Sequence, residues 1–450
     1  MKRQFFGTDG VRGEFGGPLI NPAFAWRLGA AVGRWLVSAG SLRPLVLIGR
    51  DTRYSGPILE NALAAGLQSA GADVRSLGVV PTPAVSLAVR HFGAALGVVV
   101  TASHNPAADN GIKFFSAAGT KLDDAIELTL ESLLPAADLV PAGELTPPSP
   151  LPTLPAEQIF LERVATILPA HALDGWRIVV DTGNGAAFRT TPTVLRRLGA
   201  EVFVIGDAPD GKNINAGCGS QHPQNMQRLV REKGARLGIA HDGDADRLIL
   251  ADETGAEVDG DEALAILAGH LLAAGKLQHR TLVATVQSNL GLRRFMENAG
   301  GKLVTTAVGD RYVSEAMMAG GFNLGGENSG HIICTDVSPC GDGLAAALLV
   351  LGAMRARNQP LSELRRGLTK FPQLSKALRV ARKPELATLP GLSAAILAAE
   401  KHFGANGRVL VRYSGTEPKI RLLVEGPDDG SVASVMRDLE AAVRRELPES

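Results

Sequence analysis

The sequence predicts an α/β protein with three tandem mixed α/β domains of similar topology and a smaller C-terminal α+β domain, arranged around a central cleft. The main observation is a weak threefold repeat, in which a strand-like apolar run is followed by a polar turn and a helix-like stretch. Alternation of strands and helices in this order favours parallel-rich sheets that are covered by helices. A second observation is the length of 450 residues, which allows about three or four domains of ordinary size.

The repeat predicts the elements in their order along the chain. The first strands of the three units are expected at residues 45–51, 177–183 and 282–286. The helices that follow them stop at a glycine, the usual residue after a helix end, near Gly71, Gly199 and Gly300. After a second strand and helix, third strands are expected at residues 97–100, 237–240 and 322–325. They lead into three unusual loops, TASHNP, HDGDADR and GENSGH. Ligands of such folds bind beyond the carboxyl ends of strands, so these loops could share one cleft.

Changes in composition set the expected domain boundaries. Seven prolines fall between Pro135 and Pro155, which marks a region that bridges the first and second domains. After about Pro372 the pattern changes to that of a small α+β domain, with strands near 376–380, 409–412 and 420–425 and helices near 392–402 and 432–445. We therefore expect four domains, at residues 1–155, 156–255, 256–371 and 372–450.

Composition excludes several classes of protein. Apolar residues make up 45% of the chain and charged residues 20%, which is close to globular averages and excludes a disordered chain. The 46 basic and 46 acidic residues cancel, so we expect neither nucleic acid nor an anionic membrane as partner. Three cysteines without metal-ligand spacing fit a reducing compartment, and the first residues do not resemble a signal peptide. A cytoplasmic location is therefore expected.

Three aspartates alternate in the second loop, at Asp242, Asp244 and Asp246. Their carboxylates repel one another unless a cation neutralises them, and hard oxygen ligands suit Mg²⁺ or Ca²⁺. The loop lacks the later Glu of a calcium-binding EF-hand, so Mg²⁺ beside a phosphate is the favoured interpretation. A solvated acidic turn is the alternative on this pattern alone. Arg247 could hold an anion beside the metal.

Ser103, in the first loop, offers a hydroxyl next to a histidine. A Ser–His hydrolase is one interpretation, but adjacent residues seldom reach triad geometry and the chain has no GxSxG motif. A phosphorylated serine is a second, because its oxygens could complete a Mg²⁺ site with the three aspartates. An ordinary turn or helix-cap serine is a third. Lys113, shortly after the loop, is either a general acid/base or an exposed lysine.

Two further polar stretches could bind a sugar phosphate. Glu327 and Ser329 match the donor and acceptor pattern of sugar hydroxyls, although a polar turn would look the same, and His331 alone is more often structural. In the C-terminal domain, residues 412–421 combine guanidinium and hydroxyl groups with a glycine turn. This set suits a phosphate and also fits a plain hairpin.

The chain resembles the α-D-phosphohexomutase superfamily over essentially its whole length. It carries the four motifs of that superfamily in order: TASHNP, DGDADR, GENSGH and RYSGTEPKIR. Within the superfamily it is similar to the bacterial members that act on glucosamine phosphate, on the segments 6–13, 213–220 and 308–313. Asn328 stands where amino-sugar members commonly carry Gln and where glucose- and mannose-preferring relatives usually carry Met, so an amide is kept that is one methylene shorter.

The resemblance implies interconversion of glucosamine 6-phosphate and glucosamine 1-phosphate for amino-sugar nucleotide and cell-wall precursors. Phospho-Ser103 would give its phosphoryl group to the sugar, the resulting 1,6-bisphosphate would turn around in the cleft, and its other phosphate would return to Ser103. Mg²⁺ is the implied cofactor, and glucosamine 1,6-bisphosphate or another hexose 1,6-bisphosphate is the implied phosphorylating activator. The implied partner is a small sugar phosphate, and a homodimer is possible.

The resemblance also implies a role for each candidate residue. The implied metal ligands are Ser103, Asp242, Asp244 and Asp246. The implied sugar ligands are Glu327 and Ser329. The implied ligands of the non-reacting phosphate are Arg412, Ser414, Gly415, Thr416 and Arg421. Arg247 would neutralise the transferring group and Arg12 would support the phosphoserine loop, while Lys113 and His331 are the candidates for proton transfer.

Three other functions stay open at this point. A phosphoglucomutase or phosphomannomutase would use the same mechanism on another sugar, and Asn328 does not decide between them. A Mg²⁺-dependent sugar phosphatase would let water attack the phosphoserine. A non-catalytic sensor of sugar bisphosphates would be favoured by loss of Ser103 or an aspartate, but all of these residues are present.

Overall fold

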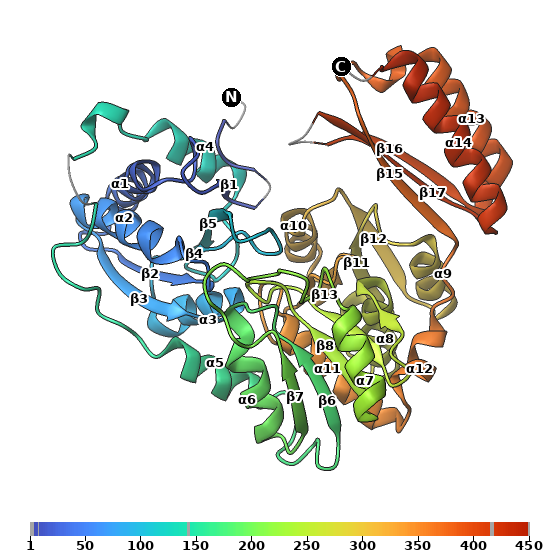
Figure 1. Cartoon of the computed structure of the whole chain (residues 1–450), viewed down its shortest axis with the longest axis horizontal. Helices are drawn as coiled ribbons and strands as arrows, with labels where there is room; N and C mark the ends of the chain where they lie inside the picture. The colour runs from blue at the N-terminus through green and yellow to red at the C-terminus, as the bar shows by residue number, and fades with distance from the viewer. Residues whose placement is uncertain (1–3, 8, 142–144, 415–417, 449–450) are drawn as a thin grey trace. The chain divides into compact units, whose positions relative to one another are not determined.

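The computed structural model of the chain describes all residues except 1–3, 8, 142–144, 415–417 and 449–450 (Figure 1). The chain divides into two compact units. The larger unit comprises Met1–Val286 and Leu303–Arg366, and the smaller comprises Gln287–Lys302 and Gly367–Ser450. Three sheets belong to the first part of the chain and one to its C-terminal part, in agreement with the predicted three α/β domains followed by a small α+β domain.

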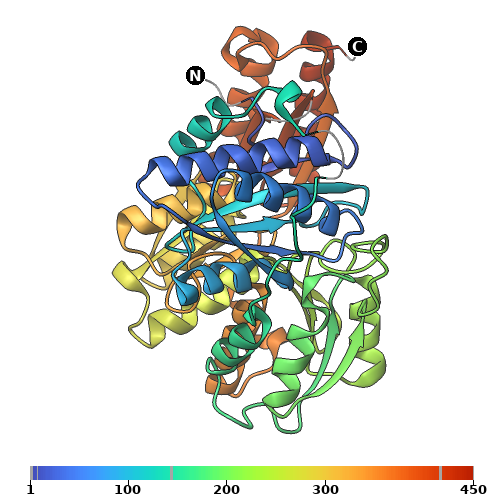
Figure 2. The same ribbon diagram turned by 90° about the vertical axis from the view of Figure 1, so that its left-hand side faces the viewer.

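The first sheet has the order β1-β5-β4-β2-β3. Its strands are β1 (Val11–Glu14), β2 (Leu45–Arg50), β3 (Asp73–Val79), β4 (Leu96–Val100) and β5 (Asp109–Ser116). The helices of this part are α1 (Pro22–Ser38), α2 (Gly56–Ser69), α3 (Thr82–Phe92) and α4 (Asp124–Ser132). Figure 2 shows α1, in dark blue, along one face of the sheet, where Phe24 and Leu28 join the same core as Val46 and Ile48.

Glycine allows α1 and α2 to approach very closely. A Cβ atom at Gly29 of α1 would lie 2.2 Å from the carbonyl oxygen of Leu63, and one at Gly66 of α2 would lie 2.1 Å from that of Trp26. Real Cβ atoms do not come so near to a backbone oxygen, because the two atoms would overlap. These two glycines therefore let the helix backbones touch, and they explain part of the high glycine content.

The second and third sheets repeat the pattern. The second has the order β10-β9-β8-β6-β7, with strands β6 (Arg177–Asp181), β7 (Glu201–Ile205), β8 (Leu237–Ala240), β9 (Ile249–Asp252) and β10 (Glu257–Val258). The third has the order β12-β11-β13-β14, with strands β11 (Thr281–Thr285), β12 (Lys302–Thr306), β13 (Leu324–Gly326) and β14 (Ile332–Cys334). The helices between α4 and the C-terminal part are α5 (Ala156–Ala165), α6 (Thr190–Arg197), α7 (Gln224–Lys233), α8 (Gly260–Ala273), α9 (Leu290–Asn298), α10 (Asp310–Gly320), α11 (Gly343–Arg357) and α12 (Leu361–Leu364).

The three loops occupy equivalent positions in these sheets. In each sheet the third strand of the repeat (β4, β8 or β13) runs parallel to the first (β2, β6 or β11). The strand after the loop (β5, β9 or β14) then returns antiparallel to the third. The predicted strand–loop order is confirmed. The predicted parallel pairing is correct for the strands before each loop, but the strand after each loop pairs antiparallel. The returning strands were not predicted from the sequence.

The smaller unit holds a three-stranded antiparallel sheet of order β15-β17-β16. Its strands are β15 (Gln373–Arg379), β16 (Arg408–Tyr413) and β17 (Lys419–Glu425), and its long helices are α13 (Pro390–Phe403) and α14 (Asp429–Glu446). Leu392 and Leu439 from the helices share a core with Ile420 and Leu422 from the sheet. The predicted strands and helices after Pro372 are confirmed, with their ends shifted by a few residues.

Helices α8 and α11 are both rich in Ala and Leu. Ten of the 15 residues of α11, including Leu344, Leu348 and Leu351, are buried. Such all-round burial explains its apolar composition, because a helix that is apolar on every side packs inside a large protein or a membrane. Among the residues that the structure describes, no helix is both long and apolar enough to cross a membrane.

Candidate active site

The second loop places three aspartates together between β8 and β9. Asp242, Asp244 and Asp246 are all buried, and each offers a carboxylate oxygen that lies within 4.8 Å of the others. One oxygen of Asp244 and one of Asp246 are buried without a hydrogen-bond partner. Burial, with Asp246 and Asp244 nearby, raises the pKa of Asp242 well above its usual value. Buried carboxylate oxygens that accept no hydrogen bond are the donor set of a hard divalent cation, so these residues fit a metal.

Ser103 meets this triad from the first loop. Its Oγ atom donates a hydrogen bond to Oδ2 of Asp242 at 2.5 Å, and the residue is 1% exposed. The backbone at Ser103 has a φ of 53°, in the left-handed region that is rare for residues other than glycine. The Nδ1 atom of His104 lies 3.3 Å from the same Oγ. The predicted meeting of the serine loop and the acidic loop is therefore present in the structure.

Lys113 points from β5 into the triad rather than into solvent. Its Nζ atom lies 2.8 Å from Oδ2 of Asp244, 3.2 Å from Oδ2 of Asp246 and 3.0 Å from Oδ2 of Asp9. Burial disfavours the ammonium form, but the three carboxylates outweigh it and hold the pKa of Lys113 well above its usual value. The exposed-lysine alternative is therefore wrong. A lysine that stays protonated acts as a fixed positive charge, which favours an electrostatic role over proton exchange.

Two arginines flank the carboxylates. The Nε atom of Arg247 lies 3.9 Å from Oδ2 of Asp242 and 4.0 Å from Oδ1 of Asp246. Arg12 forms an ion pair with Asp9. The Nε atoms of both arginines are buried without a hydrogen-bond partner. Unsatisfied guanidinium donors next to a cation site are suited to the oxygens of a phosphoryl group.

The third loop lies against the second. Arg247 and His331 form an isolated antiparallel β-bridge, which joins the two loops through their backbones. Nε2 of His331 lies 3.2 Å from Oδ2 of Asp310 and 3.9 Å from Oδ2 of Asp246. Glu327 accepts a hydrogen bond from the backbone N–H of Gly309 at 3.0 Å. The hydroxyl of Ser329 and Nδ1 of His331 are buried without a partner, as groups that await a polar ligand would be.

Sequence reasoning missed several polar and charged residues of this site. Lys121 forms ion pairs with both Asp9 and Asp310, and so links the N-terminal segment to the start of α10. Thr82, at the start of α3, donates from its hydroxyl to Oδ2 of Asp244 at 2.7 Å. Asp9 and Asp310 lie in segments that carried the resemblance, and this was a usable signal. No local pattern marks Lys121 or Thr82.

The predicted phosphate loop lies in the smaller unit. Arg412 of β16 and Arg421 of β17 are register partners, so their side chains lie on the same face of the hairpin. Two guanidinium groups on one face of a hairpin are suited to binding a phosphate, and the hairpin itself is the plain alternative that the sequence also allowed. Ser414 is buried, and its carbonyl oxygen accepts a hydrogen bond from Lys383 at 2.6 Å. Gly415 and Thr416 lie outside the described residues.

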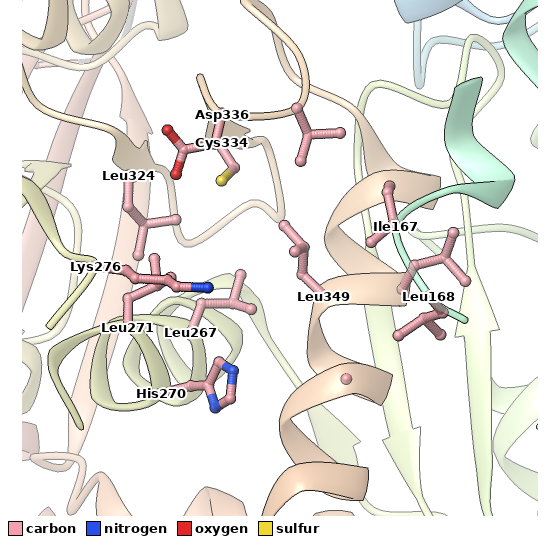
Figure 3. A pocket seen from close by; sticks show the side chains of 13 residues that line it. Ile167, Leu168, Leu267, His270, Leu271, Lys276, Leu324, Cys334, Asp336 and Leu349 are labelled. Atoms are coloured by element: carbon pink, nitrogen blue, oxygen red, sulfur yellow. The ribbon is translucent and has the colours of Figure 1, made fainter. Parts of the chain in front are cut away.

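A separate cavity of about 300 Å³ lies between α8 and α11 (Figure 3). Side chains from the two helices, including Leu267 and Leu349, face each other across it, with His270 and Lys276 at one side. None of the residues predicted for phosphoryl transfer lines it. Its lining is mostly apolar and includes no residue of the three loops, so the candidate site is the meeting point of those loops.

Comparison with known proteins is consistent over the whole chain. Models of phosphoglucomutase/phosphomannomutase match in order: α/β/α domain I at residues 3–140, domain II at 158–255, domain III at 259–371 and the C-terminal domain at 376–442. The phosphoglucosamine mutase of Cereibacter sphaeroides is 48% identical and covers 99% of both chains.

Solved structures agree with the fold. A phosphoglucomutase/phosphomannomutase family protein from Burkholderia thailandensis is 26% identical, with a TM-score of 0.81 over 100% of this chain and 98% of that one. The N-acetylphosphoglucosamine mutase of Aspergillus fumigatus, solved with GlcNAc-6P and magnesium, is 19% identical, with a TM-score of 0.65 over 99% and 96% of the two chains. The second likeness concerns the fold alone.

Proposed function

The chain belongs to the phosphoglucosamine mutase family, and we propose that it interconverts glucosamine 6-phosphate and glucosamine 1-phosphate through a phosphorylated Ser103. It is an isomerase of the mutase type. The observation that carries the residue assignment is the 2.5 Å hydrogen bond between Oγ of Ser103 and Oδ2 of Asp242. This contact puts the hydroxyl that would carry the phosphoryl group directly against the acidic triad.

Mg²⁺ is the cofactor in this proposal. Asp242, Asp244 and Asp246 would hold it, together with an oxygen of phosphorylated Ser103. The proposal is supported by the buried, unpartnered oxygens of Asp244 and Asp246. When bound, the ion would neutralise charge on the transferring phosphoryl group.

The residues of the chain would bind, orient and neutralise. Ser103 would carry the phosphoryl group until a sugar hydroxyl attacks the phosphorus; the P–Oγ bond would then break, and Oγ would take up a proton. Lys113 and Arg247 would supply fixed positive charge beside that group. His331, whose Nδ1 is unpartnered, is the better placed candidate to accept the proton of the attacking hydroxyl. Arg12, paired with Asp9, would add positive charge at the edge of the site.

Sugar recognition is the second part of the proposal. Glu327 and Ser329 would hold ring hydroxyls that both orientations of the bisphosphate present. Arg412, Ser414 and Arg421 would hold the phosphate that does not react, and the same role stays a prediction for Gly415 and Thr416. Glucosamine 1,6-bisphosphate or another hexose 1,6-bisphosphate would phosphorylate Ser103 at the start. A homodimer and a cytoplasmic location also stay predictions.

A steady-state assay tests this function. It compares kcat/KM for the 6-phosphates of glucosamine, N-acetylglucosamine, glucose and mannose, with Mg²⁺ and a catalytic amount of bisphosphate. We expect a clear preference for glucosamine 6-phosphate. A preference for glucose or mannose phosphate would contradict the substrate assignment while keeping the mechanism. Release of inorganic phosphate without a 1-phosphate product would instead indicate a phosphatase.

A further inference from the structure

The loop that carries Ser103 has an unusual backbone conformation. Ser103 has a φ of 53° and lies three residues after the end of the buried strand β4. Its N–H donates to the hydroxyl of Thr101 at 2.9 Å, but its carbonyl oxygen points away from the sheet hydrogen bonds, towards two side chains from other segments. A serine keeps a left-handed conformation only when the surrounding structure holds it there. The partners of the loop carbonyls are therefore the groups that decide where Oγ lies.

Arg53 supplies the first set of these partners. Its side chain is 1% exposed, and Nη2 donates to the carbonyl oxygens of Ser103 at 3.0 Å and Asn105 at 2.8 Å. Nη1 donates to the carbonyl of Asp109 at 2.9 Å, and the buried carboxylate of Asp51 balances its charge at 2.9 Å. Arg53 thus belongs to the same sheet region as the loop and ties the loop to its own scaffold.

Asn215 supplies the second set, from the neighbouring part of the chain. It lies in the segment NINAGCGS, which follows the second sheet's β7, and it is 8% exposed. Its Nδ2 atom donates to the carbonyl of Ser103 at 2.9 Å and to that of Asn105 at 3.0 Å. These are the same two oxygens that Arg53 binds. Each of them is therefore held by one donor from each of two parts of the molecule.

The metal loop packs directly on this arrangement. A Cβ atom at Gly243, between Asp242 and Asp244, would lie 2.6 Å from the carbonyl oxygen of Ser103 and 3.0 Å from Nδ2 of Asn215. The residue has to be glycine because no room is left for a side chain. A shift of the Ser103 carbonyl would therefore disturb the contact between the serine and the aspartates.

We propose that Asn215 is a positioning residue for phosphoryl transfer, whose side-chain amide holds the Ser103 loop against the metal loop. The inference rests on the proposed function and deepens it. Asn215 reaches backbone oxygens of the loop rather than the reacting atoms, so it acts through Ser103. Small misplacements of reacting groups cost large factors in rate, whereas Glu327 and Ser329 would still bind the sugar. Loss of the amide should therefore lower kcat and leave KM nearly unchanged.

The test compares Asn215→Gly with Asn184→Gly. Both asparagines have positive φ, of 59° and 51°, so glycine fits both backbones without strain. Both belong to the same part of the chain, but Nδ2 of Asn184 donates to the carbonyl of Asn213 at 3.3 Å and not to the serine loop. We expect Asn215→Gly to lower kcat by about 10- to 100-fold with KM within about twofold of the wild type. Asn184→Gly should keep both constants within about twofold.

A second variant and a second readout make the test independent of folding. Asn215→Asp keeps the shape but places a carboxylate against two carbonyl oxygens, so its kcat should fall at least as far as that of Asn215→Gly. With Ser103 phosphorylated by a hexose 1,6-bisphosphate, intact-mass measurements should show faster loss of phosphate to water in both Asn215 variants than in Asn184→Gly.

Two results would overturn the inference. One is an active wild type in which Asn215→Gly and Asn215→Asp match Asn184→Gly in kcat and in phosphate loss, which would leave the proposed function intact. The other is a wild type that turns over no hexose phosphate, which would overturn the proposed function and this inference with it.

Discussion

At the scale of single residues, the site is a balance of buried charges. Three carboxylates, from Asp9, Asp244 and Asp246, lie within 3.2 Å of Nζ of Lys113. Lys121 and Asp310 extend this set, and each charge has an opposite neighbour. Buried ions are costly unless they are paired, so this arrangement stabilises the protein only as a whole. A divalent cation would add positive charge next to Asp242, Asp244 and Asp246, where carboxylates gather.

Removing the buried lysine tests this balance. Lys113→Met leaves carboxylates without their counter-charge, and the free energy of unfolding should fall by about 3 to 5 kcal/mol in EDTA. With saturating Mg²⁺ the loss should be smaller, because the metal neutralises the same carboxylates. Chemical denaturation in both conditions measures the two losses. Lys401→Met, at an exposed site on α13, is the control and should change little. Equal losses with and without Mg²⁺ would contradict the balance.

At the scale of elements, a buried carboxyl group caps the start of helix α11. Asp342 caps the N-terminus of α11, where its side chain accepts the N–H of Ala345 at 2.9 Å. Burial raises the pKa of Asp342 to about 7. The folded state therefore holds a proton that the unfolded state has lost above a pKa of about 3.9. This carboxyl makes the protein less stable as the pH rises from about 4 to 7, because the folded state binds more protons over that range.

The variant Asp342→Asn removes this dependence but keeps a good capping group. Its advantage in free energy of unfolding should be near zero at pH 4 and should grow to roughly 2 to 4 kcal/mol at pH 8. Urea denaturation of both proteins across this pH range measures the difference. An advantage that is equal at pH 4 and pH 8 would show that Asp342 does not titrate as described.

The returning strands show where sequence reasoning stops. The apolar runs of β2, β6 and β11 and the loops after the third strands were predictable, because buried parallel strands have continuous apolar sequences. Strand β5 was not, since its alternation is interrupted by Asn110, Gly111 and the buried Lys113, which serve the site. The acidic and serine loops could be recognised as candidates because their polar residues stand close together in the sequence. Lys121 and Thr82 could not, because only tertiary packing brings them to the site.

At the scale of the whole molecule, helix α9 belongs to a compact unit whose other segment begins more than 60 positions later in the sequence. Helix α9 comes from the third repeat, but residues Gln287–Lys302 form part of the C-terminal unit. The side chain of Asn289 accepts the N–H of Phe371 at 2.9 Å and donates to its carbonyl at 3.0 Å. Arg294 stacks on the ring of Phe371 at 4.5 Å and donates to Asn406 at 2.8 Å. The boundaries of the third and fourth predicted domains stay predictions, but α9 belongs to the same compact unit as the C-terminal sheet.

A shortened chain tests this assignment. A chain that ends at Arg366 lacks Phe371 and Asn406, so residues 287–302 lose the partners that hold α9. We expect the larger unit to stay folded, while amide hydrogens of residues 290–298 exchange with solvent at least 100-fold faster than in the full chain. Hydrogen-exchange mass spectrometry compares the two proteins. Protection of α9 that is equal in both would place the helix with the third sheet instead.

The central claim is that Ser103 carries the phosphoryl group between the two positions of the sugar. The most direct measurement phosphorylates the protein with a labelled hexose 1,6-bisphosphate, removes the free label, and follows a single turnover with unlabelled glucosamine 6-phosphate and Mg²⁺. We predict that the label leaves Ser103 for a sugar phosphate at least as fast as kcat, and that Ser103→Ala takes up no label and shows no turnover. Turnover retained in Ser103→Ala, or label released only as inorganic phosphate, would contradict the account.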